Sequence, residues 1–282
     1  MSQEEHQKIA GLRREIAELT ARVEFRDGRI TQLVGEALDR DSELADLQAM
    51  RDVLAPADHP ARPGLEFECA FAPSADGVAG DFYLVAPGPD EDSTILAVGD
   101  VSGKGLEAAR RATFVRTALA TFACFVDDPG QLLQLSNQVL VERIGVSSTF
   151  VTAIVAVVQP REGRLAWASA GHPPPLRLDT GETLNGARPS PPLGVTTSLS
   201  CDTGQEELDP GAGLLLYSDG VTEAHRPRHE LFGEHRLTAA LREVAGSDPA
   251  AVVRRVLSDL HEHVGGTLGD DLCIVAARVQ ST

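Results

Sequence analysis

The stretch TILAVGDVSGKG, residues 94–105, decides the fold class because it joins an apolar run to a glycine-rich turn. The apolar run has the length of a buried strand and is too short for a helix. Asp100 stands where this strand meets the turn. Other short apolar runs bounded by turn residues precede and follow it, and all are predicted strands: LEFECAF (65–71), FYLVA (82–86), FVTAIVAVV (150–158), RLAWASA (164–170), PLRL (175–178), GLLLYSDG (213–220) and LCIVAARV (272–279).

Helical patterns are fewer than strands, and they lie at 106–126, 130–143, 234–244 and 249–264. Short turns such as PGPDEDS (87–93) and DTGE (179–182) join consecutive strands, which favours antiparallel pairing. We therefore predict an α+β domain of antiparallel sheets with helices on the outside. A domain of roughly 220 residues buries some 70% of the surface of its unfolded chain, so it supports one sizeable core.

The N-terminal residues 1–55 predict a coiled-coil stalk, because apolar residues repeat every seven positions. One position of the repeat holds Ile9, Ile16, Val23, Ile30, Ala37 and Leu44, and another holds Leu12, Leu19, Leu33, Leu47 and Leu54. A seam of this length normally requires a partner helix, so we expect a homodimer. A single amphipathic helix lying on the domain is the alternative. The proline-rich residues 56–64 (PADHPARPG) predict a linker, and the domain is expected at 65–282.

The composition excludes several classes of protein. The chain has 282 residues, 42% hydrophobic and 24% charged, and a formal net charge of −17. Such a charge repels phosphate backbones and anionic lipid, so nucleic acid and membrane surfaces are poor partners. There is no apolar run long enough to insert in a membrane and no signal peptide pattern, so we expect a cytoplasmic protein. The four cysteines form no CxxC pair, which argues against a disulfide framework or a cysteine-ligated zinc site.

Carboxylates stand at the ends of four predicted strands. They are Asp81 before FYLVA, Asp100 after ILAV, Asp219 after LLLY, and the pair Asp270 and Asp271 before LCIVAARV. Any one of them could be ordinary turn chemistry. If the strand ends converge, however, several negative charges meet with few cations nearby, and metal ions are needed to offset the repulsion. Oxygen ligands alone select hard cations such as Mg²⁺ or Mn²⁺.

Two other phosphate chemistries fail on spacing. GDVSGKG is not a P-loop, since three residues rather than four separate Gly99 from Gly103 and a glycine follows Lys104. The segment DEDST, which begins at Asp90, fits the DxDxT pattern of haloacid dehalogenase-like phosphatases. That motif must follow a parallel strand directly, whereas this segment follows Pro87-Gly88-Pro89 and precedes a strand. We interpret it as a hairpin turn.

Seven segments in order resemble the SpoIIE-like branch of the metal-dependent (PPM) protein serine/threonine phosphatases over residues 65–280. They are AGDFYL (79–84), GDVSGKG (99–105), TFVT (149–152), SAGHPPP (169–175), PPLGV (191–195), YSDGVTEA (217–224) and GDDLCIV (269–275). The departures from the family pattern are Ala79, Leu84, Ser169 and Cys273. The resemblance implies an antiparallel β-sandwich of two stacked sheets flanked by helix pairs.

Carried over residue by residue, the resemblance also implies a two-metal site. Asp100 would bridge two Mn²⁺ or Mg²⁺ ions, with the Val101 carbonyl helping to hold one. Asp81 would bind the second ion, and Asp219 with Asp270 the first. Two such ions activate a water for in-line attack on phosphorus, and the catalytic residues would be Asp100 and Asp219. The implied substrate is a phosphorylated protein, such as an anti-sigma-factor antagonist in bacterial partner switching.

Some interpretations remain open at this stage. Lys104 is one of only two lysines, and it either contacts phosphate or orients the loop. His172 is either a general acid or, as we favour, a structural turn histidine. A non-catalytic dimeric scaffold, a pseudophosphatase, is the alternative to an enzyme, although all the expected ligand carboxylates are present.

Overall fold

The computed structural model describes residues 29, 60–72, 80–225, 230–266 and 268–280. The predicted stalk therefore lies outside the described residues, apart from Arg29, and so does the first part of the predicted linker. Both remain predictions. Among the described residues, no helix combines the length and the apolar character that a membrane crossing requires.

One sheet has five strands in the order β2-β3-β4-β5-β7, each antiparallel to its neighbour. The strands are β2 (Phe82–Pro87), β3 (Thr94–Val101), β4 (Val151–Gln159), β5 (Arg164–Ala170) and β7 (Gly204–Glu207). β3 is buried along its whole length except at Asp100, as expected for an apolar strand with neighbours on both sides. β7 was not predicted, because its sequence GQEE has no apolar run.

The second sheet has four strands in the order β1-β9-β8-β6, again antiparallel. They are β1 (Leu65–Ala72), β9 (Leu272–Val279), β8 (Gly213–Tyr217) and the short β6 (Leu176–Arg177). The two central strands, β8 and β9, are apolar and almost fully buried, whereas the edge strand β1 is only partly buried.

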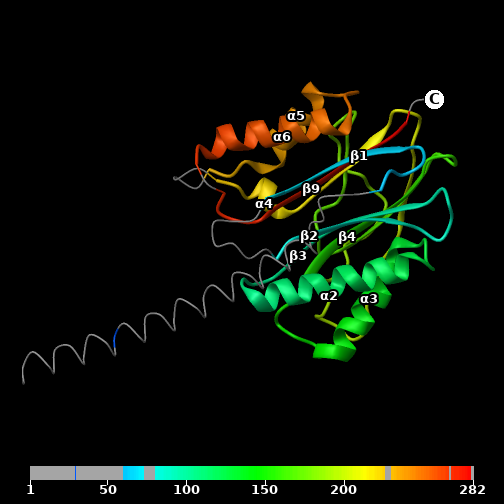
Figure 1. Cartoon of the computed structure of the whole chain (residues 1–282), viewed down its shortest axis with the longest axis vertical. Helices are drawn as coiled ribbons and strands as arrows, with labels where there is room; N and C mark the ends of the chain where they lie inside the picture. The colour runs from blue at the N-terminus through cyan, green and yellow to red at the C-terminus, as the bar shows by residue number, and fades with distance from the viewer. Residues whose placement is uncertain (1–28, 30–59, 73–79, 226–229, 267, 281–282) are drawn as a thin grey trace, which may run out of the picture. The chain divides into compact units, whose positions relative to one another are not determined.

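A pair of helices covers the outer face of each sheet (Figure 1). α2 (Leu106–Ala123) and α3 (Pro129–Ile144) pack on the five-stranded sheet, and α5 (Gly233–Glu243) and α6 (Pro249–Val264) lie over the four-stranded sheet. α4 (Asp219–Thr222) is a single turn after β8. α3 and α6 each begin after an N-cap aspartate, Asp128 and Asp248, whose carboxylate accepts a hydrogen bond from a free backbone N–H of the first turn. A proline follows each cap, at a position where no backbone N–H is needed.

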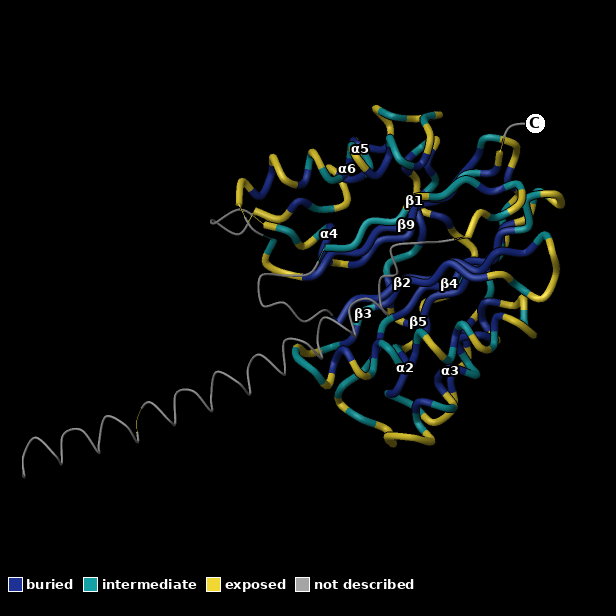
Figure 2. The backbone as a smooth tube through the Cα atoms, viewed as in Figure 1, coloured by how far each residue is buried: buried dark blue, intermediate teal, exposed yellow. Residues whose placement is uncertain are grey.

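Apolar side chains form three layers of core. One lies between the two sheets, one between α2, α3 and the five-stranded sheet, and one between α5, α6 and the four-stranded sheet. Figure 2 shows the burial concentrated along the strands, with exposed positions on the outer sides of the helices. The predicted class, an α+β antiparallel sandwich flanked by helices, is confirmed for the described residues.

Candidate metal centre

The strand ends that carry the predicted carboxylates meet between the two sheets. Asp100 is the second-last residue of β3, and Asp81 directly precedes β2. Asp219 follows β8 by two residues, while Asp270 and Asp271 directly precede β9. β3 contacts both β8 and β9, and β2 contacts β9, so the crossing of the sheets brings these ends together. We refer to the five residues as the aspartate cluster.

The charges of the aspartate cluster repel one another. Burial, followed by the nearby Asp219 and Asp270, raises the pKa of Asp100 to about 6. Burial and then Asp100 raise the pKa of Asp81 well above its ordinary value, while a hydrogen bond from the Ser218 side chain acts in the opposite direction. The pKa of Asp219 is also raised, first by burial and then by Glu223 and Asp270. The structure thus places Asp81, Asp219 and Asp270 each within electrostatic reach of Asp100.

The atoms that would bind a metal here are carboxylate and carbonyl oxygens, which suit a hard cation. Asp81 is only 2% exposed, and its Oδ2 atom has no hydrogen-bond partner, which is an unfavourable state for a buried carboxylate. At Gly80 a Cβ atom would lie 3.0 Å from the Val101 carbonyl oxygen and 3.1 Å from Asp100 Oδ1. Because Gly80 has no side chain, the space beside the Val101 carbonyl and the Asp100 carboxylate, two predicted ligands, stays open. Oxygen donors of this kind suit Mg²⁺ or Mn²⁺.

The carboxylates do not already surround a single point. Within the described ranges, no three His, Cys, Asp or Glu side chains are arranged to hold an ion. Asp81 is buried, whereas Asp270 and, taken as a whole residue, Asp219 are exposed. A cation held by these residues would offset their mutual repulsion.

Glycines beside the aspartates allow close backbone approach rather than turns alone. Gly99 lies within β3, where a Cβ atom would be 2.4 Å from the Phe82 ring. At Gly220 a Cβ atom would be 1.8 Å from the Asp271 carbonyl oxygen. These contacts join β3 to β2 and the β8 end to the β9 end, so any side chain at these two positions would separate the strand ends.

Asp271 is a residue of the site that the predicted ligand set left out. It is 8% exposed, and its Oδ2 atom accepts a hydrogen bond of 2.7 Å from the Gly80 backbone N–H. This bond ties the segment before β2 to the start of β9, and so it positions Asp81. The double aspartate at 270–271 was the available signal, but sequence alone does not show which member faces inward.

His172 joins the two sheets beneath the aspartate cluster. Its Nε2 atom lies 3.1 Å from the Tyr217 carbonyl oxygen and its Nδ1 atom 2.9 Å from Thr152 Oγ1. A carbonyl oxygen only accepts, so Nε2 carries the proton and Nδ1 accepts from the threonine. Burial lowers the pKa of His172 to about 4. A neutral histidine with both ring nitrogens engaged fits the structural role that the sequence favoured, not that of a general acid.

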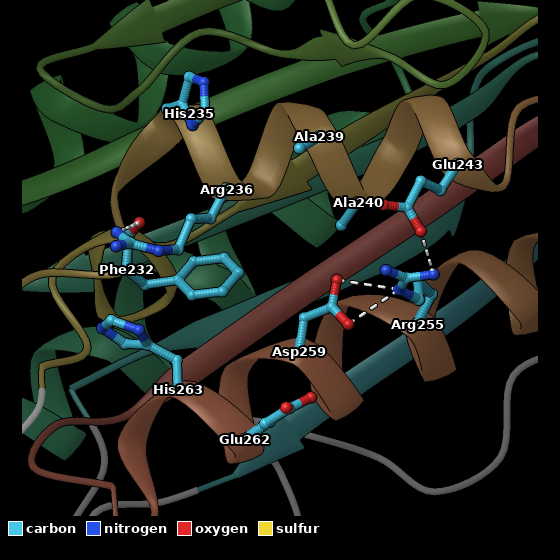
Figure 3. Close-up of a pocket in the computed structure, with 10 residues that line it drawn as sticks. All are labelled: Phe232, His235, Arg236, Ala239, Ala240, Glu243, Arg255, Asp259, Glu262 and His263. Carbon is cyan, nitrogen blue, oxygen red and sulfur yellow. Dashed lines mark hydrogen bonds and ion pairs between the residues drawn. The ribbon is translucent and has the colours of Figure 1, made fainter.

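The DxDxT segment and the groove between α5 and α6 are separate from the aspartate cluster. Asp90 lies in the β2–β3 connection, where its carbonyl oxygen accepts from the Ser93 N–H at 3.0 Å, so the DxDxT segment is a hairpin turn. A groove of about 640 Å³ lies between α5 and α6 (Figure 3). In this groove Arg255 pairs with Asp259 on the same helix, α6, and with Glu243 on α5, so this cation is already paired. Neither feature belongs to the aspartate cluster.

Comparison with known proteins gives a consistent family. The family model described as Stage II sporulation protein E (SpoIIE) matches residues 90–280. Protein IcfG of Synechocystis is 26% identical over 239 residues, covering 75% of this chain and 37% of IcfG. Phosphoserine phosphatase RsbU of Bacillus subtilis is 25% identical over 211 residues, covering 74% of this chain and 62% of RsbU. The chain thus spans less than two thirds of the length of either relative.

The fold has a solved counterpart in the SiaA-PP2C domain of Pseudomonas aeruginosa, with a TM-score of 0.74 and 24% identity over 86% of this chain and 98% of that domain. This similarity shows the fold, and the match to the family model shows the family. The chain belongs to the SpoIIE family.

Proposed function

We propose that this chain is a metal-dependent protein serine/threonine phosphatase. The observation that carries the proposal is the convergence of aspartates from both sheets around Asp81, whose buried Oδ2 atom lacks a hydrogen-bond partner. A structural role does not explain why one oxygen of this buried carboxylate lacks a partner while three neighbouring aspartates repel it. A cation does, because it offsets both the burial cost and the repulsion.

Each predicted ligand has a definite place in this proposal. Asp100 and the Val101 carbonyl would hold the shared position, Asp81 the second ion, and Asp219 with Asp270 the first. Two Mn²⁺ or Mg²⁺ ions, when bound, supply the Lewis acidity that lowers the pKa of a water molecule and offsets charge on the phosphoryl oxygens. Asp271 holds the Gly80 segment in place, and His172 bonds to both β4 and β8, which lie in different sheets.

The proposed substrate is phosphoserine or phosphothreonine on a regulatory protein. The support is the relative RsbU, named a phosphoserine phosphatase, together with the resemblance to SpoIIE-like enzymes. We further propose an anti-sigma-factor antagonist as the substrate, in a partner-switching system. Residues 1–55 would act as a dimerising coiled coil, joined by 56–64 to the phosphatase domain at 65–282.

Release of phosphate from a phosphoserine peptide, measured against free Mn²⁺ and Mg²⁺, tests the proposed activity. We expect no hydrolysis in EDTA and restoration on adding either ion. Asp100→Asn and Asp219→Asn should each remove nearly all activity, whereas Asp90→Asn, in the hairpin turn, should leave it unchanged. Full activity in EDTA would refute the metal mechanism. A folded protein with no activity at any metal concentration would favour the alternative, a non-catalytic scaffold.

A further inference from the structure

Lys104 stands on a short loop that is fixed at its base. The Ser102 N–H and hydroxyl both donate to the Phe150 carbonyl oxygen, at 2.9 and 3.1 Å, and the Ser102 hydroxyl accepts from the Phe150 N–H at 2.8 Å. Gly103 and Gly105, on either side of Lys104, have φ values of 109° and 89°, which glycine adopts readily. The loop therefore leaves β3 at a fixed point and turns sharply before α2 begins, with the lysine at its tip.

The Lys104 ammonium reaches the aspartate cluster. Its Nζ atom lies 3.7 Å from Asp270 Oδ1, and both side chains are more than half exposed. Among the ion pairs of the described residues, this one alone brings a cation to the aspartate cluster, and each of the others joins an arginine to a carboxylate outside it. An exposed pair of this length is weak, so it breaks at little cost.

The charge balance of the proposed metal-loaded site calls for a further cation, which Lys104 can supply. The cluster has five carboxylates, and two divalent cations would offset four of their charges, which leaves about one negative charge. A phosphate monoester brings nearly two more negative charges at neutral pH. Without a further cation, the loaded site would still repel the group that it must bind. Lysine is a flexible point charge with three donors, well suited to a phosphoryl group whose position differs among substrates.

We propose that Lys104 binds the phosphoryl group of the substrate. This inference rests on the proposed phosphatase function. When Asp270 binds a cation, the Lys104 ammonium leaves it and donates to a phosphoryl oxygen, which positions phosphorus over the aspartate cluster. Lys104 is thus a phosphate-binding residue that serves as the counter-ion of Asp270 only in the metal-free protein. No bond is made or broken by it.

The test measures binding of inorganic phosphate to the full-length, Mn²⁺-loaded protein by calorimetry, with KM and kcat for a phosphoserine peptide measured in parallel. Lys104→Met should weaken phosphate binding and raise KM by about tenfold each, since a hydrogen bond to a charged group is lost, with little change in kcat. Lys104→Arg should recover most of the affinity because it retains the charge. Arg110→Met removes an equally exposed cation, paired with Glu107 on α2, and is the matched control, expected to stay within about twofold of the wild type.

Three outcomes would overturn the proposal. Phosphate affinity in Lys104→Met within about twofold of the wild type would do so. So would an effect confined to Mn²⁺ affinity, because Lys104 would then only orient Asp270, or a wild-type protein that binds no phosphate. The proposed function fails separately: if the wild type binds phosphate through Lys104 but hydrolyses no phosphopeptide, the phosphatase proposal is wrong and the Lys104 assignment stands.

Discussion

Asp100→Asn should stabilise the metal-free protein while it removes the proposed activity. In the absence of metal, burial and the charges of Asp219 and Asp270 raise the pKa of Asp100 to about 6 from an ordinary value of 3.8. Each pKa unit corresponds to about 1.4 kcal/mol, so the ionised carboxylate costs about 3 kcal/mol of stability at neutral pH. Asp100 is only partly buried, and solvent screens part of this cost, so we expect a gain of about 1 to 3 kcal/mol.

The gain in the free energy of unfolding from Asp100→Asn should depend on pH. The folded protein binds the Asp100 proton more tightly than the unfolded chain, so the contribution of Asp100 to wild-type stability falls as the pH rises from about 4 to about 6. Below that window the carboxyl is protonated in both states and costs nothing. The difference between Asp100→Asn and the wild type should therefore be near zero at the acidic end and reach its full size above about pH 6.

Urea unfolding in EDTA, followed by circular dichroism between pH 4 and 8, measures this difference. Asp90→Asn makes the same chemical change in the exposed β2–β3 turn and should shift the unfolding free energy by less than about 0.5 kcal/mol at every pH. The reasoning is refuted if Asp100→Asn is less stable than the wild type in EDTA at pH 7, or if its gain is the same at all pH values.

Three further predictions concern the supports of the site and the stalk. Gly220→Ala should lower the free energy of unfolding by several kcal/mol or prevent folding, since the added Cβ would lie 1.8 Å from a backbone oxygen. Gly266→Ala, where the added Cβ meets open space, is the control and should melt within a few degrees of the wild type. Equal melting temperatures for the two variants would contradict the close backbone approach at Gly220. Because the pKa of His172 is lowered to about 4, the unfolded chain takes up this proton first, and the contribution of His172 to stability should fall by about 3 kcal/mol as the pH drops from about 6.5 to about 4. This change opposes that of Asp100 over the same range, so it is measured as the difference in unfolding free energy between the wild type and His172→Asn. A difference that does not change with pH would reject it. Deletion of residues 1–55 should give a folded monomer by sedimentation, and a truncated protein that stays dimeric with unchanged activity would rule out the stalk as the dimeriser.

The local sequence pattern predicts the strands that carry the site because these strands are apolar. β3 was predicted from TILAVGDV and is found over the same residues, and β9 was predicted from LCIVAARV. β7 was missed because GQEE is a polar edge strand whose place is fixed by pairing with β5, not by its own composition. The predicted aspartates were recognised for a similar reason, since each stands at the abrupt end of an apolar run.

Contacts between distant parts of the chain could not be predicted in this way. The Gly80 N–H and Asp271 Oδ2 are 191 residues apart in sequence, and no local pattern shows that they bond. The same holds for His172, whose tautomer is fixed by Tyr217 on β8 and Thr152 on β4.

The number of Mn²⁺ ions bound per chain, measured by equilibrium dialysis, tests the proposed metal centre most directly. The wild type should bind about two ions, and Asp100→Asn should lose most binding, because Asp100 is proposed to hold both. Asp81→Asn should bind about one ion, because its remaining partners still form the other position. A wild-type chain that binds no Mn²⁺ at millimolar concentration, or an Asp100→Asn variant that binds as many ions as the wild type, would contradict the assignment of the aspartate cluster as a two-metal centre.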